Sequence, residues 1–466
     1  MAMTNRHNQK NDCIILDTIE NLVPQDHFIR KLEEAIDWTF VYPLCKPLYS
    51  DFGRPSIDPV VLFKLIFINI IFGYNSMRKT CDECRYNLIY RWFLGLSIYD
   101  EVPNYSTWSQ NYIRRYGNSD VFDRIFVRIL SELDELGFLD VSTIFGDGTH
   151  QKANANKRKA TDAEVEIAAK EYDQALLDEI NRSREEHGKK AFDSLTKEEI
   201  RFNEHTGEEE TVVKKQHIKQ STTDPESGSY HKGEHEQCFA YSVQTFCEAH
   251  GYVLAVDTVP GNVHDSVSFH KPYNEVNKRF GEKINNVCLD SGYKTPAVCK
   301  AVIDNNQKIF TPYKRPMTKE GYLKKNEYAY DEKNDCYVCP MGVVLFYSTT
   351  DRKGYKLYKS RSSDCESCPL KEQCTKSKNG VKVVTRHIWA QYSEKADEYR
   401  HTQEWKEEYP KRKETIERVF GDCKEKSILR YTRLRGLVKN QHQSLMIFAC
   451  HNLKKMAIHK ARLGLI

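Results

Sequence analysis

Apolar residues in the N-terminal 138 residues form runs that are long enough for helices. The longest run covers residues 60–72 and follows Ser56, Asp58 and Pro59. A small polar residue before a proline is a common start of a helix, and we expect Ser56 to be the cap. The run is short for a bilayer and contains Lys64, so it predicts a buried helix rather than a membrane span.

Two further helices are predicted in this region. One covers residues 77–94, with Gly95 as its stop. Residues 102–106 form a predicted turn with a new cap, and the next helix carries Trp108. Helix-turn-helix units have this shape, but a plain helical bundle explains it equally well, because no base-reading motif is present.

Short apolar runs bounded by glycine, aspartate or proline begin near residue 140 and predict strands. They cover residues 141–145, 239–246, 252–259, 286–289 and 308–312. Helical segments at residues 267–280 and 296–304 separate the last three runs. The second and third runs are close enough to form a hairpin, and the alternation of strands and helices predicts an α/β fold.

Two polar segments interrupt this pattern. Residues 155–235 are rich in charges of both signs, and stretches such as residues 163–177 predict exposed helices. We interpret this first insert as a solvated helical hairpin without chemistry. The second insert, residues 314–405, contains a cluster of cysteines.

The composition narrows the class of protein. A chain of 466 residues is long for one domain, and 39% hydrophobic residues are enough for a core, which argues against general disorder. The polar first residues are unlike a signal peptide, so we expect a cytoplasmic protein that does not contact membranes. Fifteen cysteines then indicate thiols and a metal site rather than disulfides.

Two aspartates lie where ligands bind in open α/β sheets. Asp147 stands between two glycines after the first strand, and Asp290 directly follows the fourth. If these strands are neighbours, the two carboxylates lie side by side and repel each other unless a cation lies between them. Hard oxygen ligands suit Mg²⁺ or Mn²⁺, and two such ions about 4 Å apart can promote phosphodiester cleavage. For each aspartate alone, a turn former or helix cap is the preferred interpretation.

Several motifs together resemble the DDE transposases of bacterial insertion sequences. They are GDGTHQKANANK, DTVPGNVHDS, LDSGYKTP and IERVFGDCK with RYTRLRGL, joined by RPSIDPVVLFK and VPNYST in the helical region. The resemblance implies a ribonuclease-H-like mixed sheet flanked by helices. It also implies a catalytic triad of Asp147, Asp290 and Glu417, with two Mg²⁺ or Mn²⁺ ions. The implied reaction is cleavage and strand transfer of double-stranded DNA at element ends, by a homo-oligomer on DNA.

The segment around Glu417 departs from the family pattern of Tyr, two residues, Arg, three residues, Glu, six residues and Lys. Glu417 and Lys424 keep the last spacing, but Lys413 falls at the arginine position, with Arg412 one residue earlier. Tyr409 is likewise one residue before the tyrosine position. Lys413, Glu417 and Lys424 would share one face of a helix, which suits a carboxylate beside a phosphate but also an ordinary surface ion-pair stripe. We expect Lys424, and either Lys413 or Arg412, to bind phosphate.

Five cysteines of the second insert are spaced like zinc ligands. The C-x2-C pair occurs twice, and zinc takes four thiolates. The family resemblance selects Cys339, Cys365, Cys368 and Cys374 as ligands, with Cys336 as the alternative. A Zn²⁺ ion would fold a polar insert that lacks its own core. Free thiols and an iron–sulfur cluster are the alternatives.

The C-terminal region is strongly basic although the whole chain has a formal net charge of only +4. Residues 426–466 contain no aspartate or glutamate. Arg430, Arg433 and Arg435 could neutralise DNA phosphates, and Tyr431 could stack on a base. A solvated basic face that balances the acidic first insert is the alternative explanation.

These features predict four regions and one principal function. The regions are an all-helical N-terminal DNA-binding domain (1–138), the first part of the catalytic core (139–313), the cysteine-rich insert (314–405), and a catalytic helix with a basic helical region (406–466). Asp257, His264 and Asp265 are expected to be loop or supporting groups. The rivals to a transposase are a catalytically inactive, zinc-containing DNA-binding derivative and a nuclease of the same fold that does not join strands.

Overall fold

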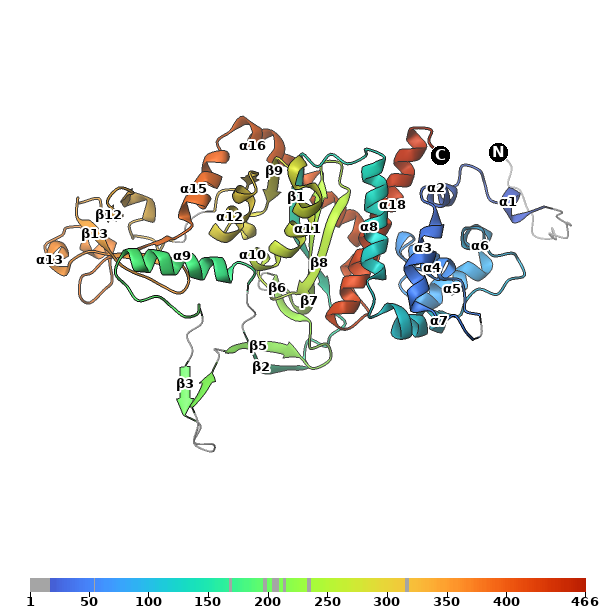
Figure 1. The fold of residues 1–466 in the computed structure, drawn as a ribbon, viewed down its shortest axis with the longest axis horizontal. Helices are drawn as coiled ribbons and strands as arrows, with labels where there is room; N and C mark the ends of the chain where they lie inside the picture. The colour runs from blue at the N-terminus through green and yellow to red at the C-terminus, as the bar shows by residue number, and fades with distance from the viewer. Residues whose placement is uncertain are drawn as a thin grey trace, which may run out of the picture. The chain divides into compact units, whose positions relative to one another are not determined.

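The computed structural model describes residues 17–53, 55–166, 170–195, 199–202, 209–212, 215–232, 236–314 and 318–466. The chain forms two compact units (Figure 1). The helical unit consists of Met1–Phe138, Cys423–Leu429 and Leu445–Ile466, and the sheet unit of Leu139–Asp422 and Arg430–Ser444. The basic C-terminal region is therefore divided between the two units.

The N-terminal part of the helical unit consists of short helices, as the sequence predicted. They are α1 Ile19–Leu22, α2 Phe28–Glu34, α3 Val41–Cys45, α4 Pro59–Ile71, α5 Met77–Tyr86, α6 Leu88–Leu94, α7 Tyr105–Asn111 and α8 Val121–Glu135. The second half of α18 (Leu437–Arg462) belongs to the same unit. Near its end the Lys460 ammonium donates to the carbonyl oxygen of Ala35 at 2.7 Å and pairs with Glu132 at 3.3 Å, which fixes α18 among these helices.

Helix α4 is the predicted buried helix, but its cap differs from the expected one. Most of its residues are buried, and the Lys64 ammonium is satisfied by Glu33 at 2.7 Å. The N–H of Val60 donates to the Asp58 carboxylate at 2.7 Å, so Asp58 and not Ser56 caps the helix. Asp58 stands directly before the first helical residue, where a cap can reach the free N–H groups. None of the helices in the described ranges has the length and apolar character needed to cross a bilayer.

The predicted helix over residues 77–94 is two helices. Asn87 ends α5 and its side chain accepts from the N–H of Ile89, so the same residue caps α6. Gly95 ends α6 as expected, in the left-handed conformation with φ of 71°. The apolar pattern continues across Asn87, which is why the sequence suggested one helix.

A six-stranded mixed sheet forms the centre of the sheet unit, in the order β10-β9-β1-β7-β6 with β8 also paired to β7. The strands are β1 Thr143–Lys152, β6 Gly228–Lys232, β7 Glu236–Glu248, β8 Val253–Pro260, β9 Asn286–Leu289 and β10 Lys308–Phe310. β1, β9 and β10 are parallel, whereas β7 is antiparallel to β1 and β8. All five predicted strands are present, and the predicted hairpin is β7–β8.

Helices lie in the connections that lead to β9 and β10, in line with the α/β prediction (Figure 1). α10 (Asp265–Ser268) and α11 (His270–Phe280) connect β8 to β9, and α12 (Pro296–Asp304) connects β9 to β10. Phe269 stacks on Tyr273 at 4.8 Å between ring centroids and meets Phe246 of β7 edge-on. The apolar side of α11 therefore covers the sheet.

The first insert is not the solvated helical hairpin that the sequence suggested. It contains β2 (Ala160–Glu166) paired with β5 (Lys215–Ser221), β3 (Glu199–Phe202) paired with β4 (Glu209–Val212), and one long helix, α9 (Asp173–Glu186). The helix predicted over residues 163–177 begins as a strand because β5, far away in the sequence, supplies its hydrogen-bond partners. Residues 167–169 of that prediction lie outside the described ranges. α9 buries Leu176 and Ile180 against Trp389, so one face of it is packed.

The cysteine-rich insert has an apolar core of its own, contrary to the expectation that zinc alone would fold it. It contains a five-stranded antiparallel sheet of β11 Ala329–Asp331, β12 Cys336–Val338, β13 Val344–Thr350, β14 Tyr355–Lys359 and β15 Val383–His387. Tyr328, Tyr337, Leu345, Tyr358 and Val384 form the core of this insert. Two short helices, α13 (Ser362–Cys365) and α14 (Lys371–Cys374), lie between β14 and β15.

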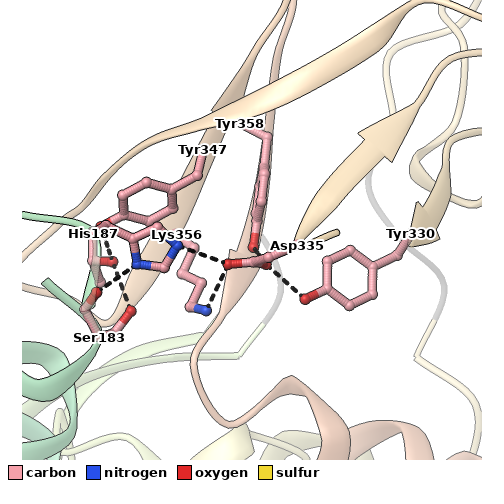
Figure 2. A network of polar contacts seen from close by, with 8 residues as sticks. Ser183, His187, Tyr330, Asp335, Tyr347, Lys356 and Tyr358 are labelled. Carbon is pink, nitrogen blue, oxygen red and sulfur yellow. Dashed lines mark hydrogen bonds and ion pairs between the residues drawn. The ribbon is translucent and has the colours of Figure 1, made fainter. Parts of the chain in front are cut away.

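A polar network joins α9 of the first insert to the sheet of the second (Figure 2). Asp335 accepts hydrogen bonds from the hydroxyl groups of Tyr330 and Tyr358 and pairs with Lys356 at 3.1 Å. His187 of α9 faces the same carboxylate at 3.1 Å through Nε2, while its Nδ1 is 2.7 Å from the carbonyl oxygen of Ser183. Both ring nitrogens therefore lie within hydrogen-bonding distance of an oxygen. The end of α9 is thus held against the sheet of the second insert.

The last part of the sheet unit leads back to the central sheet. α15 (Ala390–Tyr399) and α16 (Gln403–Glu408) are followed by a 3-10 turn, Tyr409–Lys413, and then by α17 (Ile416–Lys426). After α17, Tyr431 forms a parallel bridge with Lys152 at the end of β1, and the N–H of Thr432 donates to the carbonyl oxygen of Lys152 at 3.0 Å. The basic segment after α17 is therefore fixed beside β1.

Candidate active site

The first and fourth predicted strands are neighbours, which places Asp147 beside Asp290. β1 and β9 pair in parallel, with Gly146 opposite Leu289. Asp147 and Asp290 are the next residue on each strand, so they continue this register at the end of the pairing. Asp147 lies within β1 rather than at its end, because β1 continues in its pairing with β7 to Lys152. The sheet thus brings together two carboxylates that are distant in the sequence.

Glycines on both sides of Asp147 allow the surrounding groups to approach. A Cβ on Gly146 would lie 2.6 Å from a Leu289 methyl carbon and from the Phe246 ring. A Cβ on Gly148 would lie 2.6 Å from Nε2 of Gln244. Both distances are shorter than any normal contact, so a larger residue at either position would displace the side chains that pack around Asp147.

Arg412 is the charged partner of Asp147. Its Nη2 atom is 2.9 Å from Oδ2 of Asp147, and only 6% of the arginine is exposed. The contact is an ion pair without good hydrogen-bond geometry: within the described ranges, neither Nε nor Nη2 of Arg412 has a hydrogen-bond acceptor. The site therefore contains a buried guanidinium with donors to spare, directly beside a carboxylate.

Aromatic rings fix the position of Arg412. Its guanidinium carbon is 5.8 Å from the centroid of the Tyr409 ring, and Tyr409 stacks on Trp405 at 4.9 Å. Lys413, the other candidate for the arginine position, is exposed. Geometry thus selects Arg412, with Tyr409 three residues before it, over Lys413. Lys413 also lies in the 3-10 turn before α17, so the helix face expected to join it to Glu417 does not form.

The electrostatic environment of Asp147 is unusual for a carboxylate. Burial raises the pKa of Asp147 to about 6, the positive charge of Arg412 opposes this, and the negative charges of Asp290 and Asp265 add to it. A bound cation would relieve the repulsion among these carboxylates.

Asp265 is the group that the sequence ranked too low. Its Oδ1 accepts a hydrogen bond from Nε2 of Gln244 at 3.1 Å. A Cβ on Gly148 would lie 3.2 Å from Oδ1, and a Cβ on Gly292 would lie 3.2 Å from Oδ2. Asp265 therefore lies between Gly148, which follows Asp147, and Gly292, which is two residues after Asp290. The sequence signals for Asp265 were its place after a strand and its position in the motif DTVPGNVHDS.

The neighbours of Asp265 have structural roles, as expected. His264 caps α10, because its Nδ1 accepts from the N–H of Ser266 at 3.2 Å. Asp257 pairs with Lys271 at 2.5 Å. Tyr293, which the sequence did not single out, donates its hydroxyl to Oε1 of Gln244 and so holds the amide that faces Asp265.

Glu417 occupies the first turn of α17 and is exposed. It follows Arg412 by five residues, a length of chain that spans at most about 17 Å. Lys424 lies on the same helix and is half-buried. The third member of the expected triad is therefore on the helix that follows the Arg412 turn, with its side chain open to solvent.

The carboxylates have the donor chemistry of a site for Mg²⁺ or Mn²⁺. Asp147 and Asp290 are adjacent, and their oxygens are the ligands that such hard cations prefer. Among the described residues, however, no three His, Cys, Asp or Glu side chains are close enough together to hold one ion. The arginine at Oδ2 of Asp147 occupies one of the oxygens that a cation would use.

The cysteines of the second insert, like the carboxylates, do not form a ready-made metal site among the described residues. Cys339 and Cys374 both pack against the core of the cysteine-rich insert, and the Tyr328 hydroxyl is 3.1 Å from Sγ of Cys374. Sγ of Cys365 is 3.3 Å from Oγ of Ser360, and the N–H of Cys368 is 3.4 Å from the carbonyl oxygen of Cys365, as in a tight turn. The four thiols do not converge as zinc ligands in the described part of the chain. Cys336 is buried in β12.

The basic segment after α17 lies beside the polar residues that follow β1. The side-chain amide of Asn154 donates to the carbonyl oxygen of Arg433 at 2.8 Å. Nε of Arg435 donates to the carbonyl oxygen of Asn154 at 3.1 Å. Arg430, Arg433 and Arg435 are all exposed. This arrangement aligns exposed positive charges with the strand that carries Asp147.

Comparison with protein families gives two matches. Residues 338–457 match the model of a family described as Transposase DDE domain, and residues 17–114 match one described as Transposase domain (DUF772). The first match includes Arg412, Glu417 and the four expected zinc ligands but not Asp147 or Asp290. No curated protein matches the chain.

Proposed function

We propose a function from the family to which this chain belongs, the DDE-type insertion-sequence transposases. In this proposal the protein cleaves DNA at the ends of its element and joins the cut strand to a target. The reaction needs divalent cations. A transposase acts on DNA, so the substrate class follows from the family. The observation that carries the proposed chemistry is the adjacency of Asp147 and Asp290 on parallel neighbouring strands, with Arg412 buried against Asp147.

The proposed core is ribonuclease-H-like. The antiparallel strands β8, β7 and β1 and the parallel strands β9 and β10 form one sheet, with α11 and α12 in the connections to the parallel strands, which supports this assignment. In such a core Asp147 and Asp290 hold Mg²⁺ or Mn²⁺, and Glu417 is the third carboxylate. Two bound ions would supply an activated oxygen nucleophile and stabilise the leaving oxygen.

The residues of the chain have separate tasks in this proposal. Arg412 presents unused N–H donors beside the carboxylates, where they would hold a non-bridging phosphate oxygen. Lys424 on α17 would hold a neighbouring phosphate. Arg430, Arg433 and Arg435 would track the DNA backbone, because they are exposed and their segment is bonded to the chain that follows β1.

We further propose that Cys339, Cys365, Cys368 and Cys374 bind one structural Zn²⁺. The support is the repeated C-x2-C spacing and the shared position of Cys339 and Cys374 against one apolar cluster. Metal analysis of the purified protein tests it: about one zinc per chain is expected, lost in a Cys368→Ser variant. A metal-free wild-type protein that is fully folded would refute it. We also expect the chain to act as a homo-oligomer that brings two element ends together.

A strand-transfer assay tests the function. The substrates are duplexes that carry the DNA flanking this chain's coding sequence on either side, labelled at the 5′ end of each strand, with a supercoiled plasmid as target. With Mg²⁺ or Mn²⁺ we expect nicked duplex and label joined to plasmid. Nicking without joining would indicate the nuclease alternative, and binding without either would indicate an inactive derivative.

A further inference from the structure

The cysteine-rich insert contains a cavity lined by lysines, here called the lysine cavity. Its volume is about 730 Å³. The lining lysines are Lys319, Lys359, Lys376 and Lys382, and no acidic residue lines it among the described residues. Small-molecule pockets of this size are mostly apolar with a few polar groups. A cavity whose walls carry four ammonium groups instead favours an anion.

Several short segments form the walls, and contacts within the insert hold them in place. The N–H of Leu323 donates to the carbonyl oxygen of Gln373 at 2.9 Å, which ties the segment of Lys319 to α14. Oγ1 of Thr375 donates to the carbonyl oxygen of Val381 at 3.0 Å and closes the loop between α14 and β15. The lysines therefore converge from a packed framework.

The positive charges at this cavity are close together and have little compensation. Lys319 and Lys376 both line the cavity, so their positive charges share the same space. Lys376 also lies over the Tyr322 ring, with Nζ 5.4 Å from the centroid. Lys382 donates to the carbonyl oxygen of Cys374 at 2.7 Å, so that it supports the wall. Ammonium groups held this close repel each other, and phosphates between them would remove the repulsion.

We infer that the lysine cavity binds backbone phosphates of duplex DNA, which makes the cysteine-rich insert a second DNA contact besides the catalytic core. The inference rests on the proposed function for the identity of the partner. DNA is favoured over a single free anion because the lysines come from separate segments around a wide cavity, as repeated phosphates along a strand require. Lys319, Lys359 and Lys376 are exposed, so a large ligand can reach them.

The salt dependence of DNA binding tests this inference. Each lost phosphate contact lowers the slope of log K against log salt by about 0.9. The triple variant K319Q/K359Q/K376Q of the full chain should therefore lower the slope by about 2 to 3, measured by fluorescence anisotropy with a labelled duplex. The matched control is K333Q/K353Q/K378Q, which removes the same charge from exposed lysines of the same insert that do not line the cavity. The control should keep the wild-type slope.

The outcomes separate the two proposals. If wild type binds DNA and both triple variants change the slope equally, or neither does, the cavity is not a DNA site while the proposed function stands. If wild type does not bind duplex DNA at all, both proposals are wrong. Acylation of lysines by an N-hydroxysuccinimide ester, read by mass spectrometry on wild type, gives a check that no folding defect can affect. DNA should protect Lys319, Lys359 and Lys376 and leave Lys333, Lys353 and Lys378 reactive, and equal reactivity of both sets would overturn the inference.

Discussion

Arg412 and Lys413 are adjacent in the sequence and carry the same charge, but their environments differ. Arg412 is 6% exposed and faces Asp147, whereas Lys413 is exposed. A buried charge acts at full strength on its neighbours, while water screens an exposed one. At the residue scale we therefore expect Arg412 to act directly at the carboxylates and Lys413 to have no such role.

A pair of substitutions tests this assignment. R412Q should lower the DNA cleavage rate about 100-fold or more, because it removes a preorganised donor beside the reacting phosphate. K413Q should change the rate less than about twofold. Removing one member of a buried ion pair also destabilises the fold by about 3–5 kcal/mol, so rates are measured well below the melting temperature of each variant. A larger loss in K413Q than in R412Q would show that the lysine occupies the arginine position.

Asp265 gives a second prediction at the same scale. Its negative charge adds to the unfavourable environment of Asp147, so D265N should relieve repulsion and raise the melting temperature in the absence of divalent cations. The asparagine oxygen can still accept from Gln244, which preserves the local shape. D257N is the control with the same change of charge, and it should lower the melting temperature slightly because it breaks the ion pair with Lys271. If both variants are destabilised alike, the negative charge of Asp265 does not measurably repel that of Asp147.

At the scale of elements, α11 begins with a buried histidine. His270 is 6% exposed, contacts Tyr172 at 5.0 Å between ring centroids, and has no hydrogen-bond partner at Nε2. Burial lowers the pKa of His270 to about 4. The folded protein therefore keeps this ring neutral at pH values where the unfolded chain takes up a proton.

The stability of the sheet unit should depend on pH through His270. The contribution of neutral His270 to the free energy of unfolding is fully present above the ordinary histidine pKa of about 6.5. It is lost as the pH falls from there toward about 4. Between pH 7 and pH 5 the loss is about 2 kcal/mol. H270F removes the titrating group, so urea unfolding of this variant should show a loss smaller by about that amount. H401Q, at an exposed histidine, should behave like wild type. An unchanged pH dependence in H270F would contradict the prediction.

The elements also show which features a sequence can reveal. β9 and α12 were predicted to the residue, because each is short, apolar and bounded by glycine, aspartate or proline. β2 was missed, because its hydrogen bonds go to β5, and mixed charge alone favours a helix. A core of tyrosines was missed in the cysteine-rich insert, because the spacing of the cysteines drew attention to a metal.

The same distinction holds for the candidate site. The adjacency of Asp147 and Asp290 could be expected from where they stand relative to their strands. The choice between Arg412 and Lys413 could not, since it depends on where the 3-10 turn gives way to α17. Asp265 approaches Gly148 and Gly292 only through the tertiary fold, and a single sequence contains no sign of that contact.

At the scale of the whole molecule, positive and negative groups lie in different places, although the formal net charge is only +4. Exposed arginines follow α17 beside β1, and the lysine cavity lies in the cysteine-rich insert. The acidic groups gather where the pairing of β1 with β9 ends. DNA would be held by positive charge at two places while the reaction takes place at carboxylates. Binding and cleavage should therefore be separable by mutation.

The most direct test of that claim compares the cleavage of flanking-DNA duplexes by wild type, D290N and D178N in Mg²⁺, at protein concentrations that saturate binding. D178N removes the same charge from an exposed position on α9. We predict that D290N binds the duplex within about twofold of wild type but gives no product, which means a loss of cleavage rate of at least about 1,000-fold. D178N should cleave at the wild-type rate. Cleavage by D290N at the wild-type rate would contradict it.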